Sequence, residues 1–359
     1  MTINIDLPQN GYDIIIERGI LKRAKEELNL ERKVLIVTDS GVPSVYAETL
    51  AAQCQDAFIT VIDSGEKSKN FDNFLLLQKN MLENGFSRKD CVVAIGGGVA
   101  GDLSGFAAGC FMRGIDFYNI PTTVLSEVDS SVGGKTAVDF MGVKNVIGLF
   151  YQPKKLLIDP DTLKTLPARQ IANGLIEAIK MAATFDEEYF KMFEEAKGFD
   201  DLDLEKVIEG AVRLKADVVI KDEKEAGLRK VLNFGHTLGH GIEASTADTH
   251  LKDIVPETVY KEDYKTKGLL HGESVAIGML AMCDDEVKER IGAILDKLNV
   301  PKTAFFDEEK AMDAIMHDKK LNKNVISTVY VKKIGSFEMR DMDRDELRDR
   351  LDTLLRKKD

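Results

Sequence analysis

The chain has 359 residues, of which 44% are hydrophobic and 31% charged, and its formal net charge is −12. This composition is typical of a globular protein, and the negative charge argues against a general nucleic-acid-binding surface. No run of 18 apolar residues occurs and residues 1–10 lack the apolar core of a signal peptide, so we expect a cytoplasmic protein with no membrane partner. The four cysteines form no C-x-x-C pair, which favours reduced thiols. A chain of this length predicts two domains.

The first 160 residues alternate short apolar strands with helices. We predict strands at residues 12–17, 33–38, 57–62, 91–95 and 116–120, and helices at residues 19–29, 42–55, 70–84 and 102–110. Such alternation indicates an α/β domain whose parallel sheet is covered on both faces.

A glycine loop follows the strand at residues 91–95 directly, in Gly96-Gly-Gly98-Val-Ala-Gly101-Asp102. A strand, a glycine loop and a helix N-terminus together can bind a pyrophosphate. The spacing is not G-x-G-x-x-G, so a tight turn with close helix–sheet packing stays an alternative. Residues 133–136 superficially resemble a P-loop but lack its upstream glycine, which argues against a nucleoside triphosphatase. The lysines at 135 and 144 with Asn145 suit a phosphate or carboxylate ligand.

From residue 161 onward the periodicity becomes helical. We predict helices at residues 169–184, 204–220, 274–298 and 345–358, and a charged loop at 248–268. We therefore predict a nucleotide-binding α/β domain at 1–160 and an all-α domain, holding metal and substrate, at 161–359.

Two histidines four residues apart, His236 and His240, lie in Asn233-Phe-Gly-His-Thr-Leu-Gly-His240 and share one face of a helix. His271 opens a later apolar helical run, and Glu177 and Lys180 stand three apart on another. One carboxylate with two imidazoles is a ligand set for a catalytic zinc that keeps an open position. A histidine on an apolar helix is more often a core residue. The polar neighbours at Lys215, Arg229 and Asn233 favour a site.

Taken in order, these segments resemble the 3-dehydroquinate synthase family over nearly the whole chain. The matching motifs are Gly65-Glu66-x-x-Lys69, Gly96-Gly-Gly-x-x-Gly-Asp102, Phe111-x-Arg113-Gly114, Pro121-Thr-Thr123, Asp129-Ser-Ser-x-Gly-Gly-Lys135, Glu177-x-x-Lys180, Asn233-x-Gly-His-Thr-x-Gly-His240 and His271-Gly-Glu273.

The resemblance implies a nucleotide-binding α/β domain, a helical C-terminal domain, an active site between them, and a homodimer. It implies bound NAD and a divalent metal, zinc or cobalt. The implied reaction of the shikimate pathway, which leads to the aromatic amino acids, converts 3-deoxy-D-arabino-heptulosonate 7-phosphate to 3-dehydroquinate and phosphate. Its five steps are oxidation, phosphate elimination, reduction, ring opening and aldol closure. Whether the substrate phosphate is its own base stays open.

The resemblance also implies roles for individual residues. The metal ligands are Glu177, His236 and His271. His240 assists proton transfer, and the other catalytic residues are Lys180, Lys215 and Asp129. The substrate-binding residues are Lys135, Asn145, Arg229, Asn233, Lys319 and Arg113, the last reaching the neighbouring subunit's substrate. The NAD contacts are Asp39, Glu66, Lys69, Gly97, Gly98, Asp102, Thr122, Thr123, Lys135, Lys144, Thr162 and Thr165.

Three features depart from the family pattern. Gly41 replaces an asparagine near the adenosine ribose, residues 248–267 are longer than usual, and residues 321–324 lack a customary glycine. Three alternatives stay open: a metal-dependent polyol dehydrogenase such as a glycerol dehydrogenase, a sugar-phosphate cyclase of secondary metabolism, and a non-catalytic scaffold. Arg229, Asn233 and His240 favour dehydroquinate formation.

Overall fold

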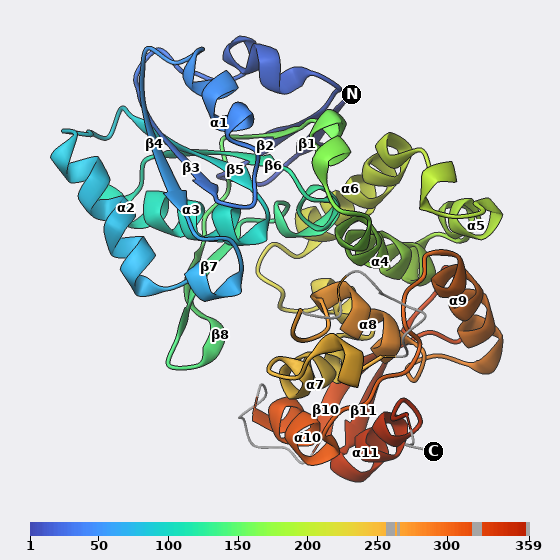
Figure 1. Ribbon diagram of the computed structural model, residues 1–359. Helices are drawn as coiled ribbons and strands as arrows, with labels where there is room; N and C mark the ends of the chain where they lie inside the picture. Colours follow the sequence, from blue (N-terminus) through green and yellow to red (C-terminus); the bar gives the residue numbers. More distant parts are fainter. Residues whose placement is uncertain (256–262, 264–265, 318–324, 357–359) are drawn as a thin grey trace. The chain divides into compact units, whose positions relative to one another are not determined.

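The computed structural model describes residues 1–255, 263, 266–317 and 325–356 (Figure 1). The chain forms two compact units, one of residues 1–171 with 204–224 and one of residues 172–203 with 225–359. This division differs from the predicted boundary at residue 160. Helix α6 (Leu204–Lys221), which we placed in the second domain, belongs to the first unit, where it packs on β1 (Thr2–Ile5).

The first unit contains a seven-stranded sheet in the order β1-β2-β9-β6-β5-β3-β4. Strand β1 runs antiparallel to β2, and the other pairs are parallel. The remaining strands are β2 (Tyr12–Ile16), β3 (Lys33–Asp39), β4 (Asp56–Ile62), β5 (Cys91–Gly96), β6 (Asp116–Pro121) and β9 (Lys155–Ile158). The five predicted strands are confirmed within a residue or two, whereas β1 and β9 were not predicted.

Helices cover both faces of this sheet, as predicted (Figure 1). On β3, Val34 and Ile36 pack toward helix α1 (Ser44–Ala51) and the 3-10 helix Ile20–Glu26. Leu35 and Val37 pack toward the opposite face, against α2 (Phe71–Glu83) and α3 (Gly98–Cys110). Successive side chains of a strand point to opposite faces, so a strand buried on both sides is a continuous apolar run.

A separate hairpin of β7 (Lys135–Phe140) and β8 (Val143–Phe150) was not predicted. It extends from the sheet unit in Figure 1, and most side chains of β8 are exposed. Short helical turns join the longer elements. They are 3-10 helices at Glu66–Ser68, Phe111–Arg113, Pro160–Thr165, Phe199–Asp201, Leu228–Asn233 and Leu251–Asp253, and a π-helical turn at Ser126–Ser130.

The second unit is mainly helical. Its helices are α4 (Ala168–Phe185, whose first turn lies in the first unit), α5 (Glu187–Glu195), α7 (His236–Thr246), α8 (His271–Met279), α9 (Asp285–Lys297), α10 (Glu308–His317) and α11 (Arg344–Asp352). It also contains a hairpin of β10 (Val325–Tyr330) and β11 (Glu338–Asp343), so the expectation of an all-α domain missed two strands. Among the described residues, no helix combines the length and the apolar character that crossing a membrane requires.

The predicted continuous helix at 274–298 is wrong, because the chain leaves the helix between α8 and α9. There Val331 donates its backbone N–H to the Met282 carbonyl, and Asp284 donates to the Val331 carbonyl, both at 3.1 Å. These bonds to the end of β10 replace intrahelical bonds while Met282 and Cys283 stay buried. Of the predicted charged loop at 248–268, residues 256–262 and 264–265 lie outside the described residues. The described part contains the 3-10 helix Leu251–Asp253 and an isolated antiparallel bridge between His250 and Lys267.

Candidate functional site

Glycines bring three helices of the second unit into backbone contact. A Cβ on Gly278 of α8 would lie 2.2 Å from the Gly235 carbonyl oxygen, at the start of α7. A Cβ on Gly272 would lie 2.0 Å from the carbonyl oxygen of Asn173 in α4. Real Cβ atoms essentially never approach so closely, so these positions require glycine. The close approach places the first turns of α7 and α8 beside the segment of α4 that carries Glu177.

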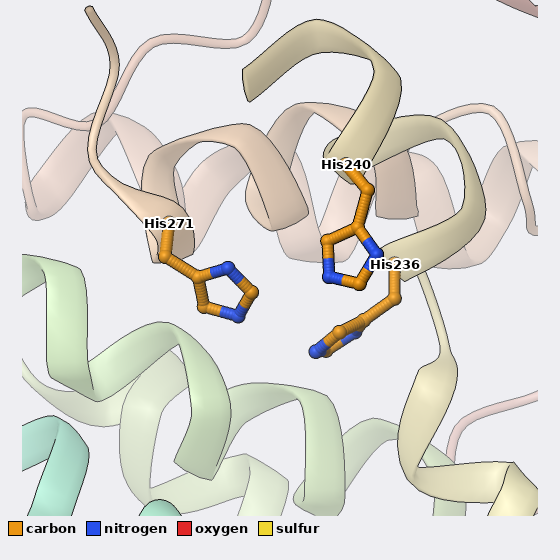
Figure 2. A group of neighbouring side chains, drawn as sticks. All are labelled: His236, His240 and His271. Atoms are coloured by element: carbon orange, nitrogen blue, oxygen red, sulfur yellow. The ribbon is translucent and has the colours of Figure 1, made fainter. Parts of the chain in front are cut away.

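The three motif histidines converge at this junction. His236 and His240 lie on α7 and His271 is the first residue of α8, and Figure 2 shows their rings turned toward one another. One ring nitrogen of each lies within 4.8 Å of the others. Burial, and next the charge of Lys180, lower the pKa of His236 well below its ordinary value, so its imidazole is neutral. Neutral imidazole is the form that binds a metal.

Glu177 is fully buried in α4 and faces two of these rings. One carboxylate oxygen, Oε2, pairs with the buried ammonium of Lys180. The other, Oε1, receives no hydrogen bond from the described residues and lies 3.8 Å from His236 Nε2 and 3.6 Å from His271 Nε2. A buried carboxylate oxygen without a partner is costly unless something binds it. A divalent cation between Oε1 and the two Nε2 atoms would meet that requirement, so these residues fit the predicted metal.

Glu243 is a residue of this cluster that our sequence analysis missed. It lies on α7, and its Oε2 is 3.1 Å from Nδ1 of His271. Burial alone would lower the pKa of His271, but the hydrogen bond to Glu243 and the charge of Glu177 raise it above its ordinary value. Its position three residues after His240 and seven after His236, on the same helical face, is a signal that could have identified it.

The glycine loop lies at a reversal of strand order in the sheet unit. Strand β4 adds to one side of β3 and β5 adds to the other, which creates a topological switch point at their carboxyl ends. Ligands of open α/β sheets bind at such points. Asp39 ends β3, and a Cβ on Gly96 would lie 3.3 Å from its Oδ2. Gly41, which departs from the family pattern, donates its N–H to Asp39 Oδ1 at 2.8 Å. Burial raises the pKa of Asp39.

Gly97 and Gly98 begin helix α3 beside this point. Gly97 has φ −76° and ψ −170°, an ordinary extended conformation, and a Cβ there would only touch Thr123 Cγ2 at 3.4 Å. The protein's own packing therefore does not require glycine at 97, whereas a Cβ on Gly98 would lie 3.0 Å from Ser130 Oγ, so close packing accounts for glycine at 98. Thr122 is buried next to this loop and donates its N–H to the Gly96 carbonyl oxygen at 3.0 Å.

Lys69 joins several predicted contacts in the same unit. Its buried ammonium pairs with Asp102 of α3 and donates to Asn145 Oδ1 in the β7–β8 hairpin. Asn145 has a positive φ of 54° and donates its backbone N–H to Asp139 Oδ1. The ammonium of Lys69 thus fixes a predicted NAD residue and a predicted substrate residue together. Burial raises the pKa of Glu66, and the charges of the nearby ammonium groups at 69 and 144 partly offset this rise.

Lys215 and Asp129, both predicted to be catalytic, contact each other. Lys215 lies on α6 and donates to Oδ1 of Asp129 at 2.6 Å and to its backbone oxygen. Asp129 belongs to the π-helical turn, a conformation that is frequent at functional sites. Glu127 of the same turn is fully buried, and burial raises its pKa well above the ordinary value.

The structure places the other predicted residues as follows. The Thr162 hydroxyl is buried and donates to the Asp159 carbonyl at 2.9 Å, while Thr165 Oγ1 contacts the Tyr46 hydroxyl. Lys135 and Lys144 are exposed on the β7–β8 hairpin, and Arg113 is exposed at φ 69°. Lys319 lies outside the described residues.

Arg229, Asn233 and His236 do not lie on one continuous helix. The chain forms the 3-10 helix Leu228–Asn233, leaves helical geometry at Phe234 and Gly235, and begins α7 at His236. Arg229 is buried, with 2% of its surface exposed, and Asn233 donates its side-chain amide to Glu225 Oε1 at 3.2 Å.

Comparisons with known proteins identify the family of this chain. Residues 59–173 match the family model of the 3-dehydroquinate synthase N-terminal domain, and residues 174–253 match that of the C-terminal domain. The chain is 38% identical to 3-dehydroquinate synthase of Sulfurimonas denitrificans, covering 95% of each chain. It is 40% identical to 3-dehydroquinate synthase of Campylobacter concisus, covering 94% of each.

Solved structures show the same fold. A 2-deoxy-scyllo-inosose synthase with carbaglucose-6-phosphate, NAD+ and Co2+ superposes with a TM-score of 0.84 at 22% identity, covering 99% of this chain and 100% of that one. A 2-epi-5-epi-valiolone synthase from Streptomyces hygroscopicus with NAD+ and Zn2+ superposes with a TM-score of 0.81 at 27% identity, covering 97% of this chain and 98% of that one. A probable glycerol dehydrogenase from Sinorhizobium meliloti has a lower TM-score of 0.63 at 15% identity, covering 95% of this chain and 96% of that one. Because two relatives exceed 30% identity over nearly their whole length, this chain belongs to the 3-dehydroquinate synthase family.

Proposed function

We propose that this chain converts 3-deoxy-D-arabino-heptulosonate 7-phosphate to 3-dehydroquinate and phosphate, using bound NAD and a divalent metal. The observation that carries the proposal is the buried Oε1 of Glu177, which faces the Nε2 atoms of His236 and His271 and has no hydrogen-bond donor within the described part of the chain. Membership of the 3-dehydroquinate synthase family supports the substrate.

The proposed metal ligands are Glu177, His236 and His271. Zinc or cobalt suits one carboxylate and two imidazoles, and such ions are present in the two related cyclase structures. A metal there would acidify a coordinated hydroxyl and polarise a carbonyl. Lys180 neutralises the charge of Glu177 Oε2 and holds the carboxylate, so that Oε1 keeps its direction. His240 is left to move a proton on the substrate.

The proposed NAD site lies at the carboxyl ends of β3 and β5. Gly97 and Gly98 leave room for the pyrophosphate at the N-terminus of α3, whose dipole favours an anion. The chemistry that NAD would supply at this site is reversible hydride transfer, without net consumption of the cofactor. Asp39 stands at the end of β3 where an acidic residue can accept a hydrogen bond from the adenosine ribose.

The remaining residues bind and position the substrate. Lys135, Arg113, Arg229 and Lys319 provide cationic groups for the phosphate and the carboxylate of the substrate. Lys215 is held by Asp129, and Asn145 is held by Lys69, so both side chains have fixed positions. Fixed binding groups of this kind reduce the conformations open to a flexible intermediate.

We also propose a homodimer and a cytoplasmic location. The β7–β8 hairpin supports the first, because Met141, Val143 and Val146 are 86%, 54% and 53% exposed. Contiguous exposed apolar side chains usually mark an interaction surface. The biosynthetic role of the family supports the second.

Incubation of the purified chain with the heptulosonate phosphate, NAD and zinc tests the function. We expect equimolar phosphate and 3-dehydroquinate, no net NADH, loss of turnover after chelation, and recovery with zinc or cobalt. Net NADH from glycerol without phosphate release would instead support the polyol dehydrogenase. Cyclitol products from other sugar phosphates, with none from the heptulosonate, would support a cyclase of secondary metabolism.

A further inference from the structure

The two histidines that face Glu177 each have an oxygen acceptor at the other ring nitrogen. Nδ1 of His236 lies 3.1 Å from the backbone oxygen of Phe234, and Nδ1 of His271 lies 3.1 Å from Glu243 Oε2. A carbonyl oxygen and an ionised carboxylate only accept hydrogen bonds, so each Nδ1 carries the proton. In the neutral form of each ring Nε2 then carries the lone pair, and in both histidines it is Nε2 that faces Glu177 Oε1, at 3.8 and 3.6 Å.

The two acceptors differ in how firmly the structure holds them. The Phe234 carbonyl lies only two residues from His236 in the chain, so local backbone geometry sets that contact. Glu243 is 28 residues from His271 in sequence and reaches it from α7. The contact therefore depends on a side chain that is 18% exposed and on the packing of α7 against α8.

The backbone at His271 is fixed without Glu243. Gly272 donates its N–H to Asn173 Oδ1 at 2.7 Å, and Leu270 donates its N–H to Glu273 Oε2 at 2.8 Å. These bonds anchor the backbone at the start of α8 but make no contact with the ring of His271, which is 30% exposed. The hydrogen bond to Glu243 restricts rotation of the ring and selects the tautomer.

We propose that Glu243 is a positioning residue of the metal site, holding His271 as the Nδ1–H tautomer with Nε2 directed at Glu177. This inference rests on the proposed function in one respect only, that a divalent metal binds there. Carboxylates that accept from the second nitrogen of a metal-bound histidine orient the ring and raise its basicity. Removing such a group typically weakens metal binding by about 10- to 100-fold.

Zinc affinity of the full-length protein tests the proposal. The apo protein is prepared by chelation and titrated with zinc against a chromophoric competitor. We expect Glu243→Ala to weaken zinc binding by about 10- to 100-fold. Glu243→Asp keeps the charge but withdraws the carboxylate by one methylene, and should weaken it similarly. Glu243→Gln retains an acceptor oxygen and should restore affinity to within a few-fold of the unsubstituted protein.

Asp248→Ala is the matched control, because it removes an exposed carboxylate just beyond the end of α7. It should leave zinc affinity unchanged. The melting temperature of each apo variant separates positioning from general stability. Nitrogen-15 NMR of the zinc-loaded protein reports whether His271 keeps its proton on Nδ1.

The outcomes are distinct. Equal zinc affinity in the unsubstituted protein, Glu243→Ala and Glu243→Asp would overturn this inference and leave the proposed function standing. A loss of apo stability in all three variants, with no recovery of affinity in Glu243→Gln, would make Glu243 a structural residue and also overturn it. No zinc binding by the unsubstituted protein would overturn the proposed function, and this inference with it.

Discussion

Replacing Gly278 by alanine should separate the two helices that carry the histidines. A Cβ at 278 would lie 2.2 Å from the Gly235 oxygen and 2.9 Å from the Gly239 nitrogen, and all of these atoms belong to backbone. Ordinary contact begins at 3.4 Å, so α8 must move by about 1 Å relative to the start of α7. Metal ligand distances tolerate only about 0.2 Å. His271 and His236 lie on opposite sides of this contact, so zinc affinity should fall.

The expected loss of stability follows from the same contact. Overpacking a buried contact costs about 1–3 kcal/mol, and alanine regains about 0.5–1 kcal/mol of helix propensity over glycine. A net loss of about 0–2.5 kcal/mol is therefore expected in the free energy of unfolding of the apo protein.

Gly292→Ala in α9 is the control. Its Cβ would meet only Lys302 Cδ, at 3.6 Å, so it should stabilise by about 0.5–1 kcal/mol and leave zinc affinity unchanged. Urea unfolding of both apo variants and zinc titration measure the two effects. If Gly278→Ala binds zinc normally and is as stable as Gly292→Ala, the described approach of α7 to α8 is wrong.

Three further predictions concern other parts of the chain. Burial raises the pKa of Glu127, so the folded state keeps a proton that the unfolded state loses above about pH 4.3. The free energy of unfolding should then fall with rising pH, by up to about 1.4 kcal/mol per pH unit, until the pH passes the raised pKa of Glu127. Glu127→Gln should remove this pH dependence when stability is measured by urea unfolding. An unchanged pH dependence in the variant would show that Glu127 is not its source. Gly97→Val should weaken NAD binding in calorimetry at unchanged melting temperature, because the structure accepts a Cβ there, and unchanged NAD affinity would favour the tight-turn alternative. Arg229→Lys keeps the charge but loses the planar guanidinium, so substrate binding should weaken by about 1–3 kcal/mol while zinc affinity is retained. A loss of stability with unchanged substrate binding would instead show that Arg229 is a structural residue.

Short-range patterns were enough to predict much of this protein from its sequence. The buried strands β3 and β5 are continuous apolar runs, and the glycine loop follows β5 directly, so the α/β unit and the position of this loop were evident. Glu177 and Lys180 meet because residues three apart on a helix are neighbours. His236 and His240 share a face of α7 for the same reason, and that local geometry was predictable.

Only the tertiary structure decided features that depend on contacts distant in sequence. The helix expected at 274–298 breaks because residues 282–284 bond to Val331, directly after β10, and only tertiary packing brings these two segments together. Arg229 and His236 are separated by a kink that Gly235 permits at φ 76°, where α7 packs on α8. Glu243 reaches His271 for the same reason, since the two lie 28 residues apart and meet only through helix packing. Sequence periodicity records which side of an element is buried, whereas the partner on that side is set by the free energy of packing the whole chain.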